Sequence, residues 1–153
     1  MEKLQYLRLD NNIITKIKGL STLVNLKWLD LSFNQISVIE GLEKCYRIQD
    51  LSLYSNKIKE LSGIENLIEL NVLSIGKNML NNLEKTLKYL VSLKNKLEVL
   101  KIAENNFPKQ NEKTYHFRCI AHLKNLKYLD YELISSKTRN DAMEEFKDEI
   151  TNT

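Results

Sequence analysis

The side chains best suited to binding a metal lie three residues apart in one segment of this sequence: His116, Cys119 and His122. A structural zinc site needs four ligands that converge on the ion. In a helix the outer two of these residues diverge, and Cys119 falls at a position better used by the core. Because a fourth ligand is also missing, we expect no metal and no cofactor.

Residues that could serve catalysis are equally incomplete. The sequence has no serine–histidine–acid pattern and only two histidines. Gly76 and Lys77 lack the further glycines and the serine or threonine of a phosphate-binding loop. Cys45 stands in the same periodic position as Leu23 and Leu67, which indicates a buried apolar residue. We therefore expect that this protein is not an enzyme.

Aromatic side chains with charged neighbours are the strongest candidates for binding chemistry. Trp28 is the clearest of them, because tryptophan and tyrosine are enriched among the hot spots of protein interfaces. We predict that Trp28 points away from the core and forms one aromatic patch with Tyr6, Phe33 and Tyr54. The sequence leaves open the alternative that these rings only stack on one another and stabilise a sheet.

Composition and charge narrow the class of protein. Of the 153 residues, 42% are hydrophobic and 28% are charged, which fits one domain or one repeat array with a real core. The net charge of +3 is small, whereas a protein that binds nucleic acid normally has a concentrated basic face. We therefore expect no nucleic-acid partner. No apolar run is long enough to span a membrane, and no leader pattern follows Met1. The two cysteines, Cys45 and Cys119, are too few for a disulfide scaffold, which favours a reducing compartment.

The elements that position these residues are repeats of the leucine-rich pattern L-x-x-L-x-L-x-x-N. Four copies follow one another at a step of 22 residues, and the fifth comes after a step of 27. The copies are Leu4, Leu7, Leu9 and Asn12; Leu26, Leu29, Leu31 and Asn34; Ile48, Leu51, Leu53 and Asn56; Leu70, Leu73, Ile75 and Asn78; Leu97, Leu100, Ile102 and Asn105. A partial sixth copy is Leu126, Leu129 and Tyr131.

This pattern predicts an α/β fold, the leucine-rich-repeat solenoid. Each L-x-L core forms a short strand whose alternate side chains point inward. Stacked units pair these strands into a curved parallel sheet on the concave face. The convex face carries short 3₁₀ or helical turns, because a 22-residue unit leaves little room for a full helix. Each buried leucine contributes roughly 1.5–3 kcal/mol of transfer free energy.

Side chains between the ladder leucines face the concave side, where repeat solenoids usually bind their partners. The first column is Tyr6, Trp28, Asp50, Val72, Val99 and Tyr128; the second is Arg8, Asp30, Ser52, Ser74, Lys101 and Asp130; the third is Asp10, Ser32, Tyr54, Gly76, Ala103 and Glu132. We predict that a partner protein contacts Tyr6, Arg8, Trp28, Asp30, Phe33, Asp50, Tyr54, Lys77, Lys101 and Tyr128.

Two periodic residue types have structural explanations. The asparagine that ends each strand can bond backbone groups of its own and the neighbouring turn, and an unpaired buried polar group costs about 1–3 kcal/mol. We therefore interpret five residues as a structural ladder: Asn12, Asn34, Asn56, Asn78 and Asn105. Gly19, Gly41 and Gly63 allow a tight outer turn or close packing.

The pattern changes after the fourth copy. A helix is predicted within 82–96, where four apolar residues share a face that packs on the core: Leu83, Leu87, Leu90 and Val91. A second helix over about 111–123, beginning near Asn111, turns four residues inward: Tyr115, Cys119, Ile120 and Leu123. With the closing strand, this segment forms a C-terminal cap over about 107–135, because an open solenoid end exposes leucines.

The two ends of the chain differ in this respect. The first unit has no cap, so it is open to solvent or to another chain. We divide the chain into the repeat domain with its cap, 1–135, and a C-terminal helix or tail, 136–153. The helix spans 136–150 with Ser136 as its N-cap. Its apolar stripe either docks on the cap or begins a coiled coil: Met143, Phe146 and Ile150.

Two known groups of proteins share residues with these repeats. The units 26–45 and 48–67 are similar to the 22-residue class typified by the phosphatase regulator SDS-twenty-two. A narrower resemblance, to subunit 3 of the dynein regulatory complex, covers nearly the whole chain. It lies in the segments 9–14, 28–34, 50–54, 74–78 and 126–131. It implies a ciliary protein of the nexin–dynein linker, where the complex regulates motility, with coiled coil after the repeats.

The sequence therefore supports a non-catalytic scaffold that binds other proteins and neither nucleic acid nor membrane. The first hypothesis is a subunit of the axonemal nexin–dynein regulatory complex, located in the cytoplasm and cytoskeleton of the cilium or flagellum. Its partners would be other subunits of that complex, axonemal dynein or microtubule-associated proteins. Two alternatives stay open: a regulatory subunit that binds a protein phosphatase through the concave face, and an axonemal dynein light chain.

Overall fold

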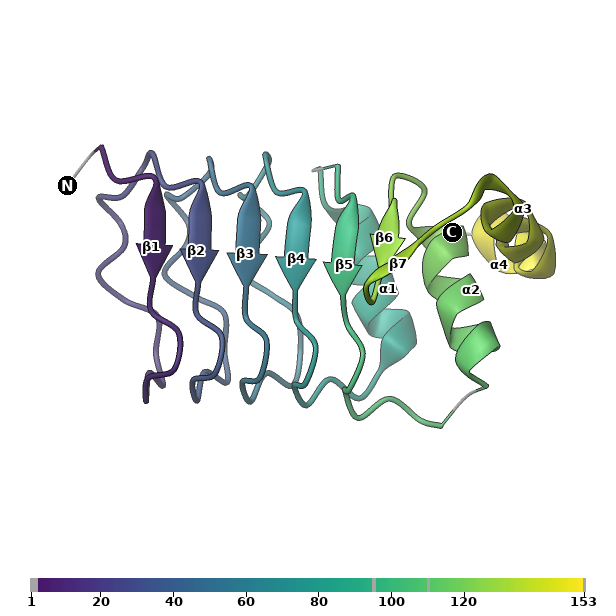
Figure 1. Ribbon diagram of the computed structural model, residues 1–153, viewed down its shortest axis with the longest axis horizontal. Helices are drawn as coiled ribbons and strands as arrows, with labels where there is room; N and C mark the ends of the chain where they lie inside the picture. Colours follow the sequence, from purple (N-terminus) through teal and green to yellow (C-terminus); the bar gives the residue numbers. More distant parts are fainter. Residues whose placement is uncertain (1–2, 95, 110, 153) are drawn as a thin grey trace.

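The computed structural model describes residues 3–94, 96–109 and 111–152, which form one sheet and four helices (Figure 1). The elements are β1 (Tyr6–Arg8), β2 (Trp28–Asp30), β3 (Asp50–Ser52), β4 (Val72–Ser74), α1 (Leu83–Ser92), β5 (Val99–Lys101), α2 (Glu112–His122), β6 (Tyr128–Leu129), β7 (Glu132–Leu133), α3 (Ser136–Glu145) and α4 (Lys147–Thr151). This arrangement confirms the α/β solenoid that the repeat pattern predicts.

Strands β1 to β6 pair in parallel, each with the strand of the next repeat, and β7 closes the sheet as an antiparallel seventh strand. The register never shifts, since Leu7 pairs with Leu29, Leu29 with Leu51 and Leu51 with Leu73. Each pattern position is therefore stacked on its counterpart, as the aligned arrows of Figure 1 show. In the same figure α1 lies behind the sheet, on the side away from its exposed face.

The core is the set of stacked ladders inside these strands. Leu29, Leu51 and Leu73 are fully buried, with 0% of their surface exposed. The first unit differs, because Leu4 is 38% exposed and Leu7 is only partly buried. Among the described residues, the ladder leucines of the first unit are therefore less buried than those of the units that follow.

The asparagines at the strand exits link neighbouring units. The Asn56 Nδ2 donates to the carbonyl of Leu31 in the preceding unit at 3.0 Å and to that of Leu53 in its own at 3.1 Å. Its Oδ1 accepts from the backbone N–H of Ile36, again in the preceding unit, at 2.9 Å. These bonds pair backbone groups that the stacking removes from water.

Close packing requires glycine at two of the three periodic positions. Gly41 and Gly63 have φ of +74° and +72°. An alanine Cβ at Gly63 would lie 2.1 Å from the carbonyl oxygen of Ile39, and one at Gly41 would lie 2.6 Å from that of Ile17. The outer turn of each unit therefore lies directly against the unit before it.

Helices α1 and α2 replace the short outer turns in the last units, as predicted. Both begin at an asparagine N-cap: Asn82 accepts from the backbone N–H of Lys85, and Asn111 from that of Lys113. The prediction for Val91 is wrong, because its side chain is 48% exposed. Neighbouring helical residues point about 100° apart, so the helix that buries Leu90 must turn Val91 outward.

The C-terminal segment packs back onto the repeat domain. Helix α3 contacts α2, and it buries Ala142 and Phe146. Its N-cap is Ser135, whose Oγ accepts from the backbone N–H of Thr138, so the prediction of Ser136 is off by one residue. The stripe is also not continuous, because the helix breaks at Phe146 and Met143 is 39% exposed. The division of the chain at residue 135 stays a prediction.

In the part of the chain that the structure describes, no helix is both long and apolar enough to cross a membrane.

Candidate functional site

The exposed face of strands β1 to β6, here called the concave face, carries most of the residues predicted to bind a partner. In the first column Tyr6 lies beside Trp28, and Trp28 beside Asp50. In the second column Arg8 lies beside Asp30. Tyr6 is 67% exposed, whereas Trp28 and Asp50 are half-buried. The structure thus brings these five residues together on one continuous surface.

Trp28 and Asp50 are neighbours across β2 and β3, and both side chains are half-buried. Burial raises the pKa of Asp50, and the charge of Lys101 and the nearby Trp28 side chain offset only part of that rise. A half-buried tryptophan offers a large contact area at a low cost in side-chain entropy.

The charged side chains beside this pair already have partners within the chain. Arg8 Nε donates to Asp10 Oδ1 at 2.6 Å, and this bond is the main reason that the pKa of Asp10 lies below its usual value. Asp30 accepts from the backbone N–H of Ser32 at 2.9 Å and from its hydroxyl. The charges are therefore pre-oriented, although Arg8 remains largely exposed.

Phe33 and Lys77 stand at a repeat position with a shared backbone conformation, which the sequence analysis did not predict. They and their counterparts Asn11, Ser55 and Glu104 all have φ between 51° and 62°. A left-handed conformation costs a non-glycine residue roughly 1–2 kcal/mol, and here the asparagine that follows secures the turn. The turn places the Phe33 ring edge-on against Tyr54, with 5.6 Å between centroids.

Tyr54 crosses a whole repeat to reach Glu104, a residue missed by the sequence analysis. Its hydroxyl donates to the Glu104 carboxylate at 2.8 Å, and this bond raises the pKa of Tyr54. Gly76 lies between them, and an added Cβ there would lie 3.2 Å from the Tyr54 ring. A glycine at this position could have indicated that a neighbouring side chain, here that of Tyr54, crosses above the backbone.

The predictions for Tyr131 and Glu132 as members of the repeat columns are wrong. Asp130 and Tyr131 both have positive φ, 46° and 73°, so the chain turns back as β7 instead of continuing the repeat. Tyr131 is consequently 75% exposed, and Lys101 Nζ lies 4.3 Å from its ring centroid. This cation–π contact places Lys101 and Tyr131 at the C-terminal end of the concave face, near Tyr128 on β6.

Asp130 is also not on the concave face. Its carboxylate accepts from the backbone N–H groups of Ile102 at 2.7 Å and Ala103 at 3.0 Å, and from the Tyr115 hydroxyl at 3.2 Å. Burial is the main reason that the pKa of Tyr115 is raised, and the nearby negative charge of Asp130 raises it further. Asp130 therefore joins the last repeat to α2, which is a structural task.

The three side chains of α2 that are chemically suited to bind a metal have separate environments. Cys119 is fully buried, and its burial raises the pKa of the thiol. His116 Nε2 lies 3.9 Å from Asp130, whereas His122 Nε2 lies 4.0 Å from Glu149. Among the residues that the structure describes, no three histidine, cysteine, aspartate or glutamate side chains are grouped to hold a metal ion.

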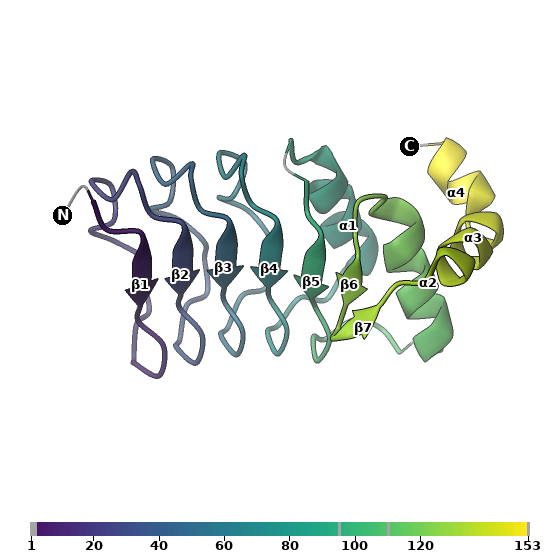
Figure 2. The same ribbon diagram turned by 45° about the horizontal axis from the view of Figure 1, so that its top comes forward.

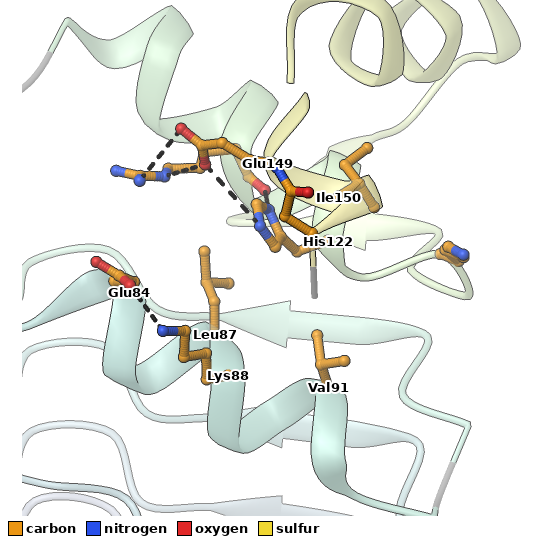
Figure 3. A pocket seen from close by; sticks show the side chains of 10 residues that line it. Glu84, Leu87, Lys88, Val91, His122, Glu149 and Ile150 are labelled. Atoms are coloured by element: carbon orange, nitrogen blue, oxygen red, sulfur yellow. Dashed lines mark hydrogen bonds and ion pairs between the residues drawn. The ribbon is translucent and has the colours of Figure 1, made fainter. Parts of the chain in front are cut away.

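A cavity lies on the opposite side of the sheet, between α1 and the C-terminal residues that include α4 (Figure 3). This cavity of about 490 Å³ has Leu87, Val91 and Ile150 as its apolar wall. Its rim is ionic, with Lys88 paired to Glu84 at 2.8 Å and Arg118 to Glu149 at 3.1 Å. Val91, which the geometry of α1 turns outward, lines this cavity.

Comparison with known proteins fits the repeat geometry. The family profile described as leucine-rich repeat matches residues 2–153. Curated protein sequences give no match. A chain in the crystal structure of the Drosophila melanogaster SNF/U2A' complex is 27% identical, with a TM-score of 0.82, over 97% of this chain and 87% of that chain.

Two bacterial structures share the fold over part of their length. Internalin C2 of Listeria monocytogenes is 26% identical, with a TM-score of 0.63, over 84% of this chain and 51% of that chain. The functional domain of InlJ from the same organism is 20% identical, with a TM-score of 0.62, over 90% of this chain and 28% of that chain. The latter likeness shows the fold alone.

Proposed function

This chain belongs to the leucine-rich-repeat family, and we propose that it is a non-catalytic subunit that holds a partner protein on its concave face. Leucine-rich repeats typically serve as scaffolds for protein–protein interaction. The observation that carries the proposal is the half-buried Trp28 indole, placed between its strand neighbours Asp50 and the exposed Tyr6. Interface hot spots typically combine such an aromatic with a ring of charged side chains.

The charge of this face indicates the chemistry of the partner. Asp30 and Asp50 lie in the middle of its first half, and both would repel the phosphates of a nucleic acid. Because burial raises the pKa of Asp50, a basic side chain that reached it would stabilise its ionised form. We expect a protein that inserts an apolar group beside Trp28 and a lysine or arginine beside Asp50.

For the assembly, we propose the axonemal nexin–dynein regulatory complex, and with it a location in the cilium or flagellum. The resemblance to subunit 3 of that complex includes the segments 28–34 and 50–54, which contain β2 and β3. Trp28, Asp50 and Tyr54 within them stand at variable positions, where the repeat consensus alone does not require these residues. This likeness on the exposed columns supports the narrower family.

A second candidate is a subunit of a different assembly. The likeness to a chain of the SNF/U2A' complex extends over 97% of this chain, and that protein is part of a complex. A phosphatase regulator and an axonemal dynein light chain are further alternatives. All of them are proteins that bind another protein, so the identity of the partner distinguishes them.

The test is recovery of the tagged chain from a ciliated cell. Axonemes would be purified, extracted with salt, and the bound proteins identified by mass spectrometry. We expect the chain to stay with the regulatory complex, and Trp28→Ala to weaken binding by about 30-fold or more. Tyr46→Ala is the matched control, because Tyr46 is 45% exposed in an outer turn, away from the sheet.

Each outcome decides one level of the proposal. Recovery from the soluble cell body with a phosphatase or another assembly would replace the axonemal partner and keep the scaffold. Unchanged binding by Trp28→Ala, with Tyr46→Ala equally active, would overturn the concave face as the binding surface.

A further inference from the structure

The outer side of the first repeat, here called the β1 edge, consists of β1, the turn at Asn12 and the outer turn at Gly19. We propose that the β1 edge is an interface for one further leucine-rich repeat unit, stacked in parallel on the first. Figure 2 shows this edge bare, whereas the opposite end is covered by β7 and the helices. The argument rests on four groups of atoms that each later unit uses to bind the unit before it.

The first group is a pair of backbone donors at the start of each strand. Lys27 and Trp28 donate their N–H groups to the carbonyl of Gln5 at 2.8 and 3.0 Å. The same pair of bonds recurs at Gln49 and Asp50, at Asn71 and Val72, at Glu98 and Val99, and at Lys127 and Tyr128. The equivalent donors of the first unit are Gln5 and Tyr6, which have no acceptor among the described residues.

The second group is the asparagine ladder. The Oδ1 atoms of Asn34, Asn56, Asn78 and Asn105 each accept a backbone N–H from the preceding unit, at 2.9–3.0 Å. Their Nδ2 atoms each donate to a carbonyl there as well. Among the described residues, Asn12 donates only within its own unit, to Leu9 and Asp10. Its side chain already has the orientation that would bind a preceding turn.

The third group is the outer glycine. Gly41 and Gly63 face a carbonyl of the preceding unit so closely that a Cβ would collide with it. Gly19 has the same conformation, with φ +79°, but none of the described residues lies within 4 Å of the Cβ that alanine would add there. The first unit is therefore shaped for a neighbour at this point too.

The fourth group is apolar. Leu4 is 38% exposed, whereas its counterparts Leu26, Ile48 and Leu70 are fully buried. Ile13 is 82% exposed. Beside it Leu9, Ile14, Ile17 and Leu20 line a hollow of about 380 Å³. A stacked unit would bury this surface in the way that each later unit buries its neighbour.

The pairing of β6 with β7 excludes a second copy of this chain as the parallel stacking partner. Parallel stacking needs a partner whose last strand has a free outer side. Here β6 is paired on that side with β7, through Tyr128 with Leu133 and Leu129 with Glu132. A copy could therefore only pair β1 with β1 in reverse, which would not place a carbonyl opposite Gln5, Tyr6 and Asn12 as the repeats do. The occupant must be a leucine-rich unit that is open on its C-terminal side.

The test adds such a unit and asks whether the edge recognises it. A copy of residues 26–47 would be joined directly before Leu4, which keeps the 22-residue step. We expect the thermal midpoint to rise by at least about 5 °C. We also expect the amides of Gln5 and Tyr6 to become protected from hydrogen exchange, as those of Lys27 and Trp28 are in both proteins.

Gly19→Ala makes the test specific to the interface. In the parent chain it adds only the strain of positive φ, whereas in the extended chain its Cβ meets the new unit, so the loss in midpoint should at least double. Gly63→Ala is the matched control and should cost the same in both. An unchanged midpoint, or equal losses for Gly19→Ala, would overturn the proposal.

The native occupant can be identified by cross-linking. A photoreactive residue at Ile13 in the tagged protein should capture a peptide that carries the L-x-x-L-x-L pattern. Capture of a segment without this pattern would overturn the proposal. So would a concentration-dependent dimer, seen by sedimentation, that buries the β1 edge against its own copy.

Discussion

The two faces of the same three-residue strands follow opposite rules. Inward, Leu29, Leu51 and Leu73 are identical and fully buried. Outward, their neighbours Trp28 and Asp50 share neither size nor charge. The inward position must fill a gap of fixed shape between two units, whereas the outward position meets only solvent or a partner. The fold is therefore determined by the inward columns, and the proposed function assigns binding specificity to the outward ones.

The largest expected effect is on the inward face. Leu51→Ala should lower the free energy of unfolding by about 2–5 kcal/mol, because it leaves a cavity between two rigid units. Ser52→Ala, one residue away and half-exposed, should stay within about 0.5 kcal/mol. Urea denaturation of both variants measures the difference. Equal losses would mean that the two faces are not distinct.

The asparagine ladder sharpens the comparison between inner and end units. Asn56→Ala leaves the N–H of Ile36 and the carbonyl of Leu31 without their side-chain partner, at a cost of about 1–3 kcal/mol. Asn12→Ala should cost less than half as much, because Asn12 bonds only its own turn. Chemical denaturation would contradict this account if the two losses were the same.

Gly76→Ala probes the outward face where Tyr54 crosses the next repeat. The added Cβ would lie 3.0 Å from the Ala103 carbonyl oxygen and 3.2 Å from the Tyr54 ring, so it would push the ring aside and weaken its bond to Glu104, for a loss of roughly 1 kcal/mol. The pKa of Tyr54, raised by that bond, should then fall toward its usual value. Titration of tyrosine absorbance detects the change, and Tyr54→Phe identifies the signal. A tyrosine titration like that of the unmodified protein would show that the ring does not depend on Gly76.

Asp50→Asn should have the smallest effect on stability, and with the opposite sign. Burial raises the pKa of Asp50 in the folded protein above its unfolded value, so the fold favours the protonated form and loses stability as pH rises through this range. The asparagine variant removes that loss. At neutral pH it should be as stable as the parent or more so, by less than about 1 kcal/mol. Below the unfolded pKa of aspartate the difference should vanish. A variant that is clearly less stable at neutral pH would refute the raised pKa.

Where sequence reasoning failed, the cause was a choice between equally allowed local arrangements. Leu90 and Val91 both fit an apolar stripe on α1, and only packing against the last repeats decides that Leu90 is buried. Asp130 and Tyr131 fit the repeat frame, yet their positive φ ends it. Ser135 and Ser136 are both good N-cap residues, and the helix begins so that Ser135 is the cap. The Tyr54–Glu104 bond joins residues 50 positions apart, beyond any local pattern.

The sequence by itself determined the repeat frame, the inward ladders, the asparagines at the strand exits and the two helices of the last units. These follow from periodicity, because every unit must bury the same columns against its neighbour. Only the tertiary structure decided how Trp28 lies beside Asp50, how β7 covers one end of the sheet, and which groups of the β1 edge lack a neighbour among the described residues. These features depend on contacts between units and at their ends, where the repeat no longer prescribes which residue is present.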